Sequence, residues 1–248
     1  MKFKEFVLST TATSALLFTT LGFGNIVSAE EKISTEDHIL NFILEKNPGL
    51  EKEELLKDIN NIVINEKKSK KEILKQIQSK LKSQEENTNK GEFTTLGNNK
   101  GTKIIGNSKK GNIYYTNADT WGLNHGHVGM YYKKTHIVES VPKLGVRSIS
   151  AKKRKVEKGA VVKSIKVATK KKNAAVDWGK GRIKKDGYSY NFATNRTTGH
   201  YGSKNCSKLI WSAFKLKAKI DIDKNGGLGV YPRDVRDSGY TKLVRKVK

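Results

Sequence analysis

Hydrophobic residues follow two different periods along the chain. Between residues 34 and 85 they recur every three or four positions, which is the spacing of amphipathic helices. Ser34 before acidic residues, and Ser69 three positions before Glu72, are typical helix starts, and 47–49 ends the first run. The predicted apolar faces comprise Ile39, Leu40, Ile43, Leu44, Leu55, Ile59, Ile62, Val63, Ile73, Ile77 and Leu81.

Three such helices must bury their apolar faces against something. The pattern leaves three possibilities open: a small bundle, a pro-segment packed on the rest of the chain, or a module that binds a partner. We therefore predict a helical N-terminal region over 30–85, followed by a polar linker over 86–103 that is rich in Gly, Asn and Lys.

Beyond residue 104 the pattern changes to strands and turns. Four segments have the alternation or the β-branched content of strands: 111–115, 127–132, 136–141 and 159–167. Helical patterns follow at 173–181 and 203–217. The order predicts an α+β domain over 104–248, with an antiparallel sheet and a helix near its end.

The first 29 residues have the features of a secretory signal. Two lysines precede an uncharged apolar stretch, and Val27-Ser28-Ala29 is a small-residue cleavage pattern. The stretch is short for a membrane anchor, and no cysteine lies at the cleavage site for a lipid anchor. We expect cleavage after Ala29 and a secreted, extracellular or cell-wall-associated mature protein.

Charge is distributed unevenly between the two regions. The chain of 248 residues has a formal net charge of +25. Residues 30–90 hold 13 acidic and 12 basic residues, whereas 35 basic and 10 acidic residues follow from Gly91 onward. Such an excess outside a cell favours an anionic envelope polymer, or anionic lipid headgroups, as the partner. Nucleic acid is not expected, because no reading motif accompanies the charge.

The single cysteine, Cys206, lies at the start of the helix predicted over 203–217. With Ser203 as the N-cap, the thiol falls in the first turn, where the unpaired N–H groups and the neighbouring Lys204 and Lys208 favour a thiolate. The alternative is a buried structural cysteine. One thiol excludes an internal disulfide and a multi-cysteine metal site.

A hairpin supplies the partners that a cysteine nucleophile needs. If 133–135 form its loop, Tyr132 pairs with His136 and Glu139 lies opposite Gly129. His127 and Glu139 then share one face, because side chains alternate along a strand, and His136 lies on the other face. The register predicts His127 as the base and Glu139 as the residue that orients it.

These residues carry a family resemblance. The motif 127–129 with Glu139 twelve residues later, and the segment 205–211 around Cys206, resemble the permuted papain-like amidases of the YiiX/YaeF type, relatives of NlpC-type cell-wall hydrolases and of lecithin:retinol acyltransferase. In that group the histidine comes first in the sequence, the polar residue that orients it comes second, and the cysteine comes last, as here. The resemblance covers roughly 104–240 and implies a permuted papain-like (NlpC-type) domain with a nucleophile helix.

The resemblance also implies a reaction. Cys206 would attack an acyl carbon, His127 would accept and return the proton, and Glu139 would hold the imidazole. We expect a secreted cysteine hydrolase that cleaves amide bonds in peptidoglycan peptides. The alternatives are a lipid acyl-ester hydrolase or acyltransferase, and a non-catalytic basic domain that binds anionic envelope polymers.

Other residues are secondary candidates. Lys204, Lys208, His125 and Trp121 could bind the substrate or an anion. No cofactor is expected, and no metal, because only the His125-x-His127 pair has ligand spacing. The segment 221–226 opens like a calcium loop, but Pro232 stands where a bidentate Glu is required, so a turn is predicted. His200 is expected to be an ordinary loop histidine, and the basic run 152–155 a surface feature.

Overall fold

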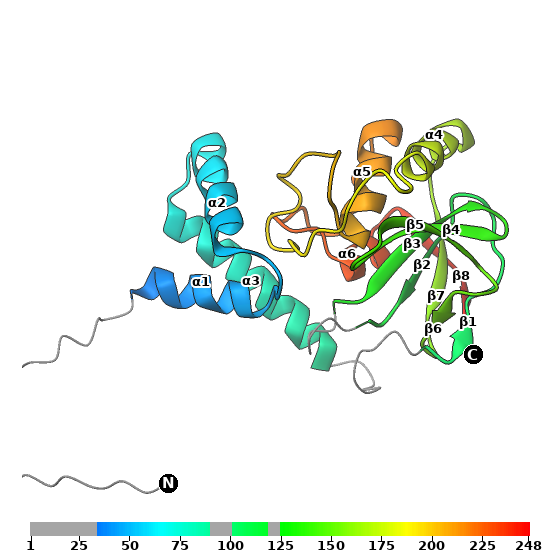
Figure 1. Cartoon of the computed structure of the whole chain (residues 1–248), viewed down its shortest axis with the longest axis horizontal. Coiled ribbons are helices and arrows are strands. Elements are labelled where there is room, and N and C mark those ends of the chain that lie inside the picture. The colour runs from blue at the N-terminus through cyan, green and yellow to red at the C-terminus, as the bar shows by residue number, and fades with distance from the viewer. Residues whose placement is uncertain (1–33, 90–100, 119–124) are drawn as a thin grey trace, which may run out of the picture. The chain divides into compact units, whose positions relative to one another are not determined.

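A computed structural model describes residues 34–89, 101–118 and 125–248 of the chain (Figure 1). The predicted signal segment 1–29 and most of the predicted linker lie outside these residues. Within the described ranges, no helix combines the length and the apolar character that a membrane span requires.

The three predicted helices are present: α1 (Thr35–Glu45), α2 (Lys52–Glu66) and α3 (Lys70–Asn89). Both predicted helix starts are correct. The Ser34 hydroxyl accepts from the backbone N–H of Asp37 at 3.1 Å, and Ser69 and Glu72 form a reciprocal capping box. The last helix extends four residues beyond the predicted limit of 85.

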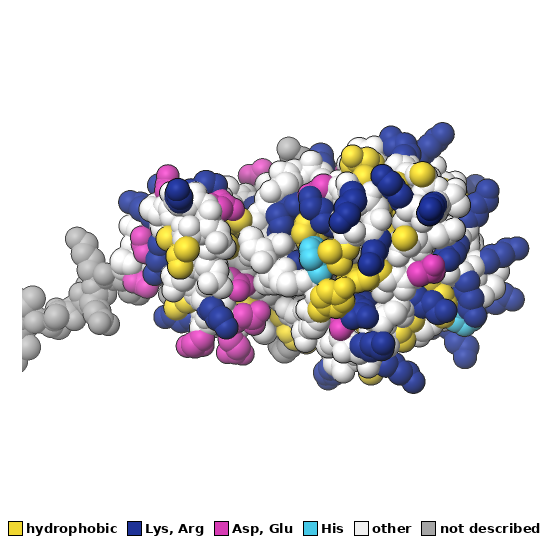
Figure 2. All heavy atoms as spheres, turned by 90° about the horizontal axis from the view of Figure 1, so that it is seen from above, with side chains coloured by type: hydrophobic (Ala, Val, Ile, Leu, Met, Phe, Trp, Pro, Cys, Tyr) yellow, Lys and Arg dark blue, Asp and Glu magenta, His cyan; other side chains and the backbone are white. Residues whose placement is uncertain are grey.

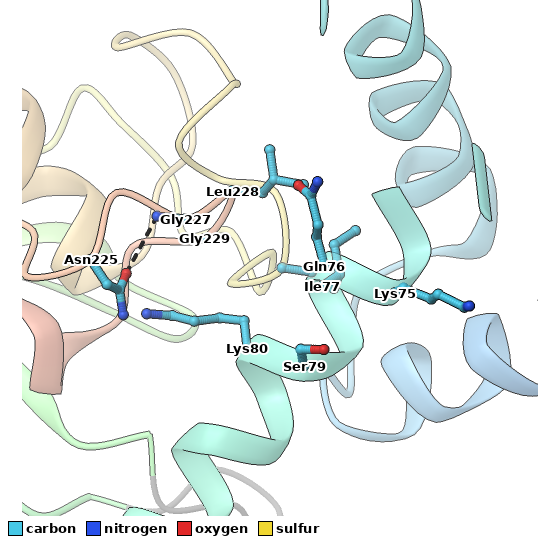
Figure 3. A pocket seen from close by; sticks show the side chains of 10 residues that line it. Lys75, Gln76, Ile77, Ser79, Lys80, Asn225, Gly227, Leu228 and Gly229 are labelled. Atoms are coloured by element: carbon cyan, nitrogen blue, oxygen red, sulfur yellow. Dashed lines mark hydrogen bonds between the residues drawn. The ribbon is translucent and has the colours of Figure 1, made fainter. Parts of the chain in front are cut away.

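The apolar faces of the three helices pack on one another and on the second region. Their buried residues form one cluster with Phe192, Ala193, Leu228 and Tyr231. Beside it, α3 and the turn 225–229 line a pocket of about 520 Å³ (Figure 3). The three helices therefore pack both on one another and on the rest of the chain.

A six-stranded antiparallel sheet with the order β5-β4-β3-β2-β7-β8 organises the second region. Its strands are β2 (Ile113–Thr116), β3 (His127–Lys133), β4 (His136–Val141), β5 (Gly145–Ser150), β7 (Val161–Ile165) and β8 (Thr241–Lys246). A separate two-stranded ribbon pairs β1 (Lys103–Ile104) with β6 (Lys155–Val156). The predicted α+β class with an antiparallel sheet is confirmed.

Two clusters of buried residues cover the sheet. One face packs against α4 (Thr169–Lys180) and α5 (Cys206–Ala218) through residues such as Val128, Met130 and Val138. The other face carries Tyr114, Tyr131 and Ile137. The helix α4 begins four residues before the predicted start, and β5, β8 and α6 (Pro232–Arg236) were not predicted.

Candidate active site

The hairpin of β3 and β4 has the predicted register near the candidate residues but not at its turn. Met130 pairs with Val138, and Tyr131 with Ile137, as expected. The predicted pairing of Tyr132 with His136 is wrong: Lys133 pairs with His136, and the register shifts between Tyr131 and Lys133. The irregularity adds one residue to β3 near the turn. It leaves unchanged the pairs that place His127 and Glu139 on the same face of the sheet.

The structure brings His127 and Glu139 together. Nε2 of His127 lies 3.0 Å from Oε2 of Glu139, and the carboxylate is fully buried. Because a carboxylate only accepts hydrogen bonds, Nε2 carries the proton and donates. Nδ1 of His127 is then the ring nitrogen left for the thiol.

Three residues that the sequence analysis missed surround the carboxylate. Arg147 donates to Oε1 of Glu139 from Nε at 2.9 Å and from Nη2 at 2.7 Å. Nε of Arg154 lies 3.0 Å from Oε2, and the Tyr114 hydroxyl also donates to Oε2. Pairing β4 with the unpredicted β5 sets Arg147 opposite Glu139, so correct recognition of that strand would have identified this partner.

Arg154 corrects the interpretation of the basic run 152–155 as a surface feature. Its side chain is buried, and Nε also donates to the Tyr114 hydroxyl at 2.7 Å. A charge in the interior requires compensation, and here Glu139 supplies it. A run of like charges gives no signal for which member turns inward.

These contacts determine the proton affinities of the site. Burial alone would raise the pKa of Glu139, but Arg154, His127 and Arg147 outweigh it and hold this pKa well below its usual range. Burial lowers the pKa of His127, but the charge of Cys206 and hydrogen bonds with Cys206 and Glu139 outweigh it, so this pKa lies above its usual value. The site thus favours an ionised carboxylate beside an imidazole that readily accepts a proton.

Gly129 lies near His127 and Glu139, at a position where the ring of Tyr114 leaves no room for a side chain. A Cβ at this position would come within 2.5 Å of Cε1 of Tyr114. That ring brings its hydroxyl to Glu139 and to Arg154. The glycine therefore gives room to a tyrosine that holds the carboxylate, a role that spacing alone did not reveal.

Cys206 is the first residue of α5, but the predicted cap is wrong. The N-cap is Asn205, whose Oδ1 accepts from the backbone N–H of Lys208 at 3.0 Å. Ser203 lies outside the helix, two residues before the cap. The thiol thus sits at the helix start, 2% exposed.

Neighbouring residues of β4 connect both parts of the site. Glu139 holds His127 on one face of the sheet, and the adjacent Ser140 donates to the backbone carbonyl of Lys204 at 2.6 Å on the other. That carbonyl is two residues before Cys206. One strand thereby fixes the imidazole and the chain segment that leads into α5.

Lys204 and Lys208 are not placed to bind an anion, which corrects the prediction. Both are buried: Nζ of Lys204 lies 2.5 Å from Oδ2 of Asp186, and Nζ of Lys208 donates to the Thr198 carbonyl at 2.8 Å. Burial, together with the charges of Lys204 and Arg196, lowers the pKa of Lys208 to about 7. Both amino groups therefore bind partners inside the protein.

The other histidines of the second region have separate partners. His125 is buried and stacks on Phe192, with ring centroids 4.8 Å apart. Nδ1 of His200 lies 2.9 Å from the Ser212 hydroxyl, and its ring stacks on Trp211. His136 is near Tyr132, away from Glu139. Trp121 lies outside the described residues.

The carboxylates of the segment 221–226 have internal partners. Arg196 binds Oδ2 of Asp221 at 2.8 Å and also pairs with Asp223, so the predicted turn is held by a guanidinium. In residues 34–89, 101–118 and 125–248, no group of three or more His, Cys, Asp or Glu side chains could hold a metal ion.

Fold and site together define an α+β protein in which a cysteine begins α5 and a histidine is held by a buried glutamate. No family model matches the chain. The chain is 46% identical over 204 residues to the uncharacterized protein YycO of Bacillus subtilis (strain 168). The matched region covers 81% of this chain and 83% of that protein. The chain therefore belongs to the YycO family.

Among solved structures, the chain is similar to the metalloprotein YiiX from Escherichia coli O157:H7. The similarity covers 56% of this chain and 97% of that one, with a TM-score of 0.44 and 16% sequence identity.

Proposed function

We propose that this protein is a cysteine hydrolase that cleaves amide bonds, with Cys206 as nucleophile, His127 as base and Glu139 as the residue that orients the imidazole. The observation that carries the proposal is the 3.0 Å contact between His127 Nε2 and Glu139 Oε2. This contact leaves Nδ1 of an imidazole of raised pKa for the thiol of Cys206.

The proposed reaction has two steps. The thiol proton passes to Nδ1 of His127 as Sγ bonds to the acyl carbon, and the imidazolium then protonates the leaving amine as the C–N bond breaks. Water, deprotonated by the same Nδ1, attacks the thioester and releases the acid and the free thiol. The backbone N–H of Cys206 at the helix start is the proposed donor to the oxyanion.

Envelope peptides are the proposed substrate class. The predicted signal segment directs the chain outside the cell membrane, where peptidoglycan offers abundant amide bonds. In the face drawn in Figure 2, Lys and Arg side chains are spread over the second region. Acidic side chains gather over the N-terminal helices. A cationic surface of this kind favours association with an anionic wall polymer.

The test is turnover by the purified protein and its Cys206→Ala, His127→Ala and His136→Ala variants. New amino groups released from wall fragments would support the amidase, and fatty acid released from phospholipid would instead indicate an esterase. We expect loss of turnover in the first two variants and retention in His136→Ala, the matched histidine on the other sheet face. Full turnover by Cys206→Ala, or wall binding without turnover by the wild type, would contradict the proposal.

A further inference from the structure

The helices of 34–89 share a core with the chain segment that precedes the nucleophile helix. Phe192 and Ala193 of that segment are buried in the same cluster as Leu55 and Ile59 of α2. The two parts therefore form a continuous apolar interior, and the segment 190–205 takes its position partly from the helices.

Asp58 of α2 reaches from the helices into this segment. Its Oδ2 accepts from Nδ2 of Asn191 at 2.9 Å and from the Thr194 hydroxyl at 2.7 Å. Asn191 in turn accepts from the backbone N–H of Thr194 at 2.9 Å, and both residues are buried. One carboxylate oxygen thus holds a compact polar turn that has little contact with water.

The same turn holds the cap of the nucleophile helix. The Asn191 carbonyl accepts from Nδ2 of Asn205 at 2.8 Å, and Nδ2 of Asn195 donates to Oδ1 of Asn205 at 3.2 Å. Asn205 is fully buried and immediately precedes Cys206. A continuous set of hydrogen bonds therefore leads from Asp58 to the residue that sets the first turn of α5.

A second contact joins the helices to the neighbourhood of the thiol. Gly49 has a φ of +90°, and a Cβ there would come within 2.8 Å of Cγ of Tyr190. The Tyr190 ring meets Tyr188 edge-on, with centroids 4.9 Å apart. Burial raises the pKa of Tyr188, and the charge of Cys206 raises it further.

We propose that the helical region is a working part of the active site, and that Asp58 is a positioning residue that directs Cys206 toward His127 through Asn191, Thr194 and Asn205. The inference rests on the proposed function, in which Cys206 is the nucleophile. It assigns the helices a supporting role and opposes the idea of an inhibitory segment, whose loss would activate the thiol. Supporting shells of this kind fix the geometry of reactive groups.

The test measures alkylation of Cys206 by iodoacetamide as a function of pH in the full chain. Asp58→Leu removes the acceptor oxygen, whereas Asp58→Asn keeps an oxygen that can accept both bonds. We expect alkylation to slow about 10- to 100-fold in Asp58→Leu, with a changed pH profile, since misplacement of about 1 Å has effects of this size. Asp58→Asn should stay near the wild-type rate.

Two controls distinguish the possible failures. Glu53→Gln, an exposed acid on the same helix, should leave the rate unchanged, and His127→Ala defines the rate without the base. A wild-type rate in Asp58→Leu with a slow His127→Ala would overturn the positioning role alone. Equal rates in His127→Ala and the wild type would instead refute the proposed function.

Thr194→Val provides an independent variant should Asp58→Leu not fold. It removes one of the two donors to Asp58 and leaves the carboxylate in place. We expect alkylation to slow by about threefold to tenfold, a smaller effect than in Asp58→Leu because the hydrogen bond from Asn191 to Asp58 remains. A folded Thr194→Val that reacts at the wild-type rate and with the wild-type pH profile would overturn the proposal.

Discussion

The two halves of the candidate site are held by opposite kinds of interaction. The carboxylate half consists of His127, Glu139, Arg147, Arg154 and Tyr114, and it is ionic: two guanidiniums compensate one buried carboxylate. The cysteine half consists of Cys206, its cap Asn205 and the amides that hold this cap, and its bonds are neutral. The ionic contacts depend on pH because the carboxylate titrates, whereas the contacts between amides join groups that do not titrate.

The largest effect should come from the carboxylate half. Glu139→Gln leaves the buried Arg154 without its anion, so we expect the free energy of unfolding to fall by about 3 to 5 kcal/mol at pH 7. Activity should fall as well, though less than in Cys206→Ala. Urea unfolding at several pH values is the measurement.

The pH dependence of this loss has a defined sign. The pKa of Glu139 is held below its unfolded value of about 4.5, so its stabilising effect is fully present above that pH and is lost as the pH falls. The difference between the wild type and Glu139→Gln should therefore shrink in acid. A difference that is constant from pH 7 to pH 3 would show that the carboxylate acts by shape and not by charge.

An intermediate effect is expected in the cysteine half. Asn205→Ala removes the N-cap of α5 and should lower the free energy of unfolding by about 1 to 2 kcal/mol. It should also slow alkylation of Cys206, because the first helical turn loses its anchor. The measurements are thermal unfolding and the iodoacetamide rate.

A second cap in the chain serves as the matched control. Ser69→Ala removes the capping box of α3, at an exposed position, and should lower stability by a comparable amount. Its thiol should react at the wild-type rate. Equal alkylation rates in the two variants would mean that the cap of α5 contributes stability alone.

The last prediction concerns Lys208, a buried lysine of α5 near the cysteine half. The unfolded chain holds the Lys208 proton up to about pH 10.5, and the folded chain only up to about 7, so the free energy of unfolding should rise with pH between these values. Lys208→Met should flatten this slope, whereas Lys217→Met, at an exposed position of α5, should not. The measurement is urea unfolding at several pH values from 6.5 to 8.5. If the free energy of unfolding had the same slope with pH in both variants, the charge of Lys208 would be exposed to water.

Local patterns predicted much of the framework. The faces of the three helices, the caps at Ser34 and Ser69, the four strands and the class of fold followed from periodicity and turn chemistry. The common facing of His127 and Glu139 also followed, because alternation along a strand depends only on position. The pairing at the hairpin end failed because an irregularity of one residue has no periodic signal.

The partners of the site residues could not be predicted in the same way. Arg154 was assigned to the surface because its neighbours in sequence are lysines, and only folding shows which of them meets Glu139. Ser203 was predicted as the cap because serine suits that role, but asparagine suits it equally well. The choice depends on the backbone carbonyl of Asn191 and the side-chain amide of Asn195, which contact Asn205 from a turn more than nine residues earlier.

By itself, the sequence determined the elements, their apolar faces, the parity of side chains along each strand and the presence of a single thiol. Only the tertiary structure decided which charges are buried, which residue caps α5 and where the N-terminal helices pack. The reason is physical: periodicity and capping act between residues a few positions apart. The contact of Asp58 with Thr194 joins residues 136 positions apart and exists only when the whole interior has assembled.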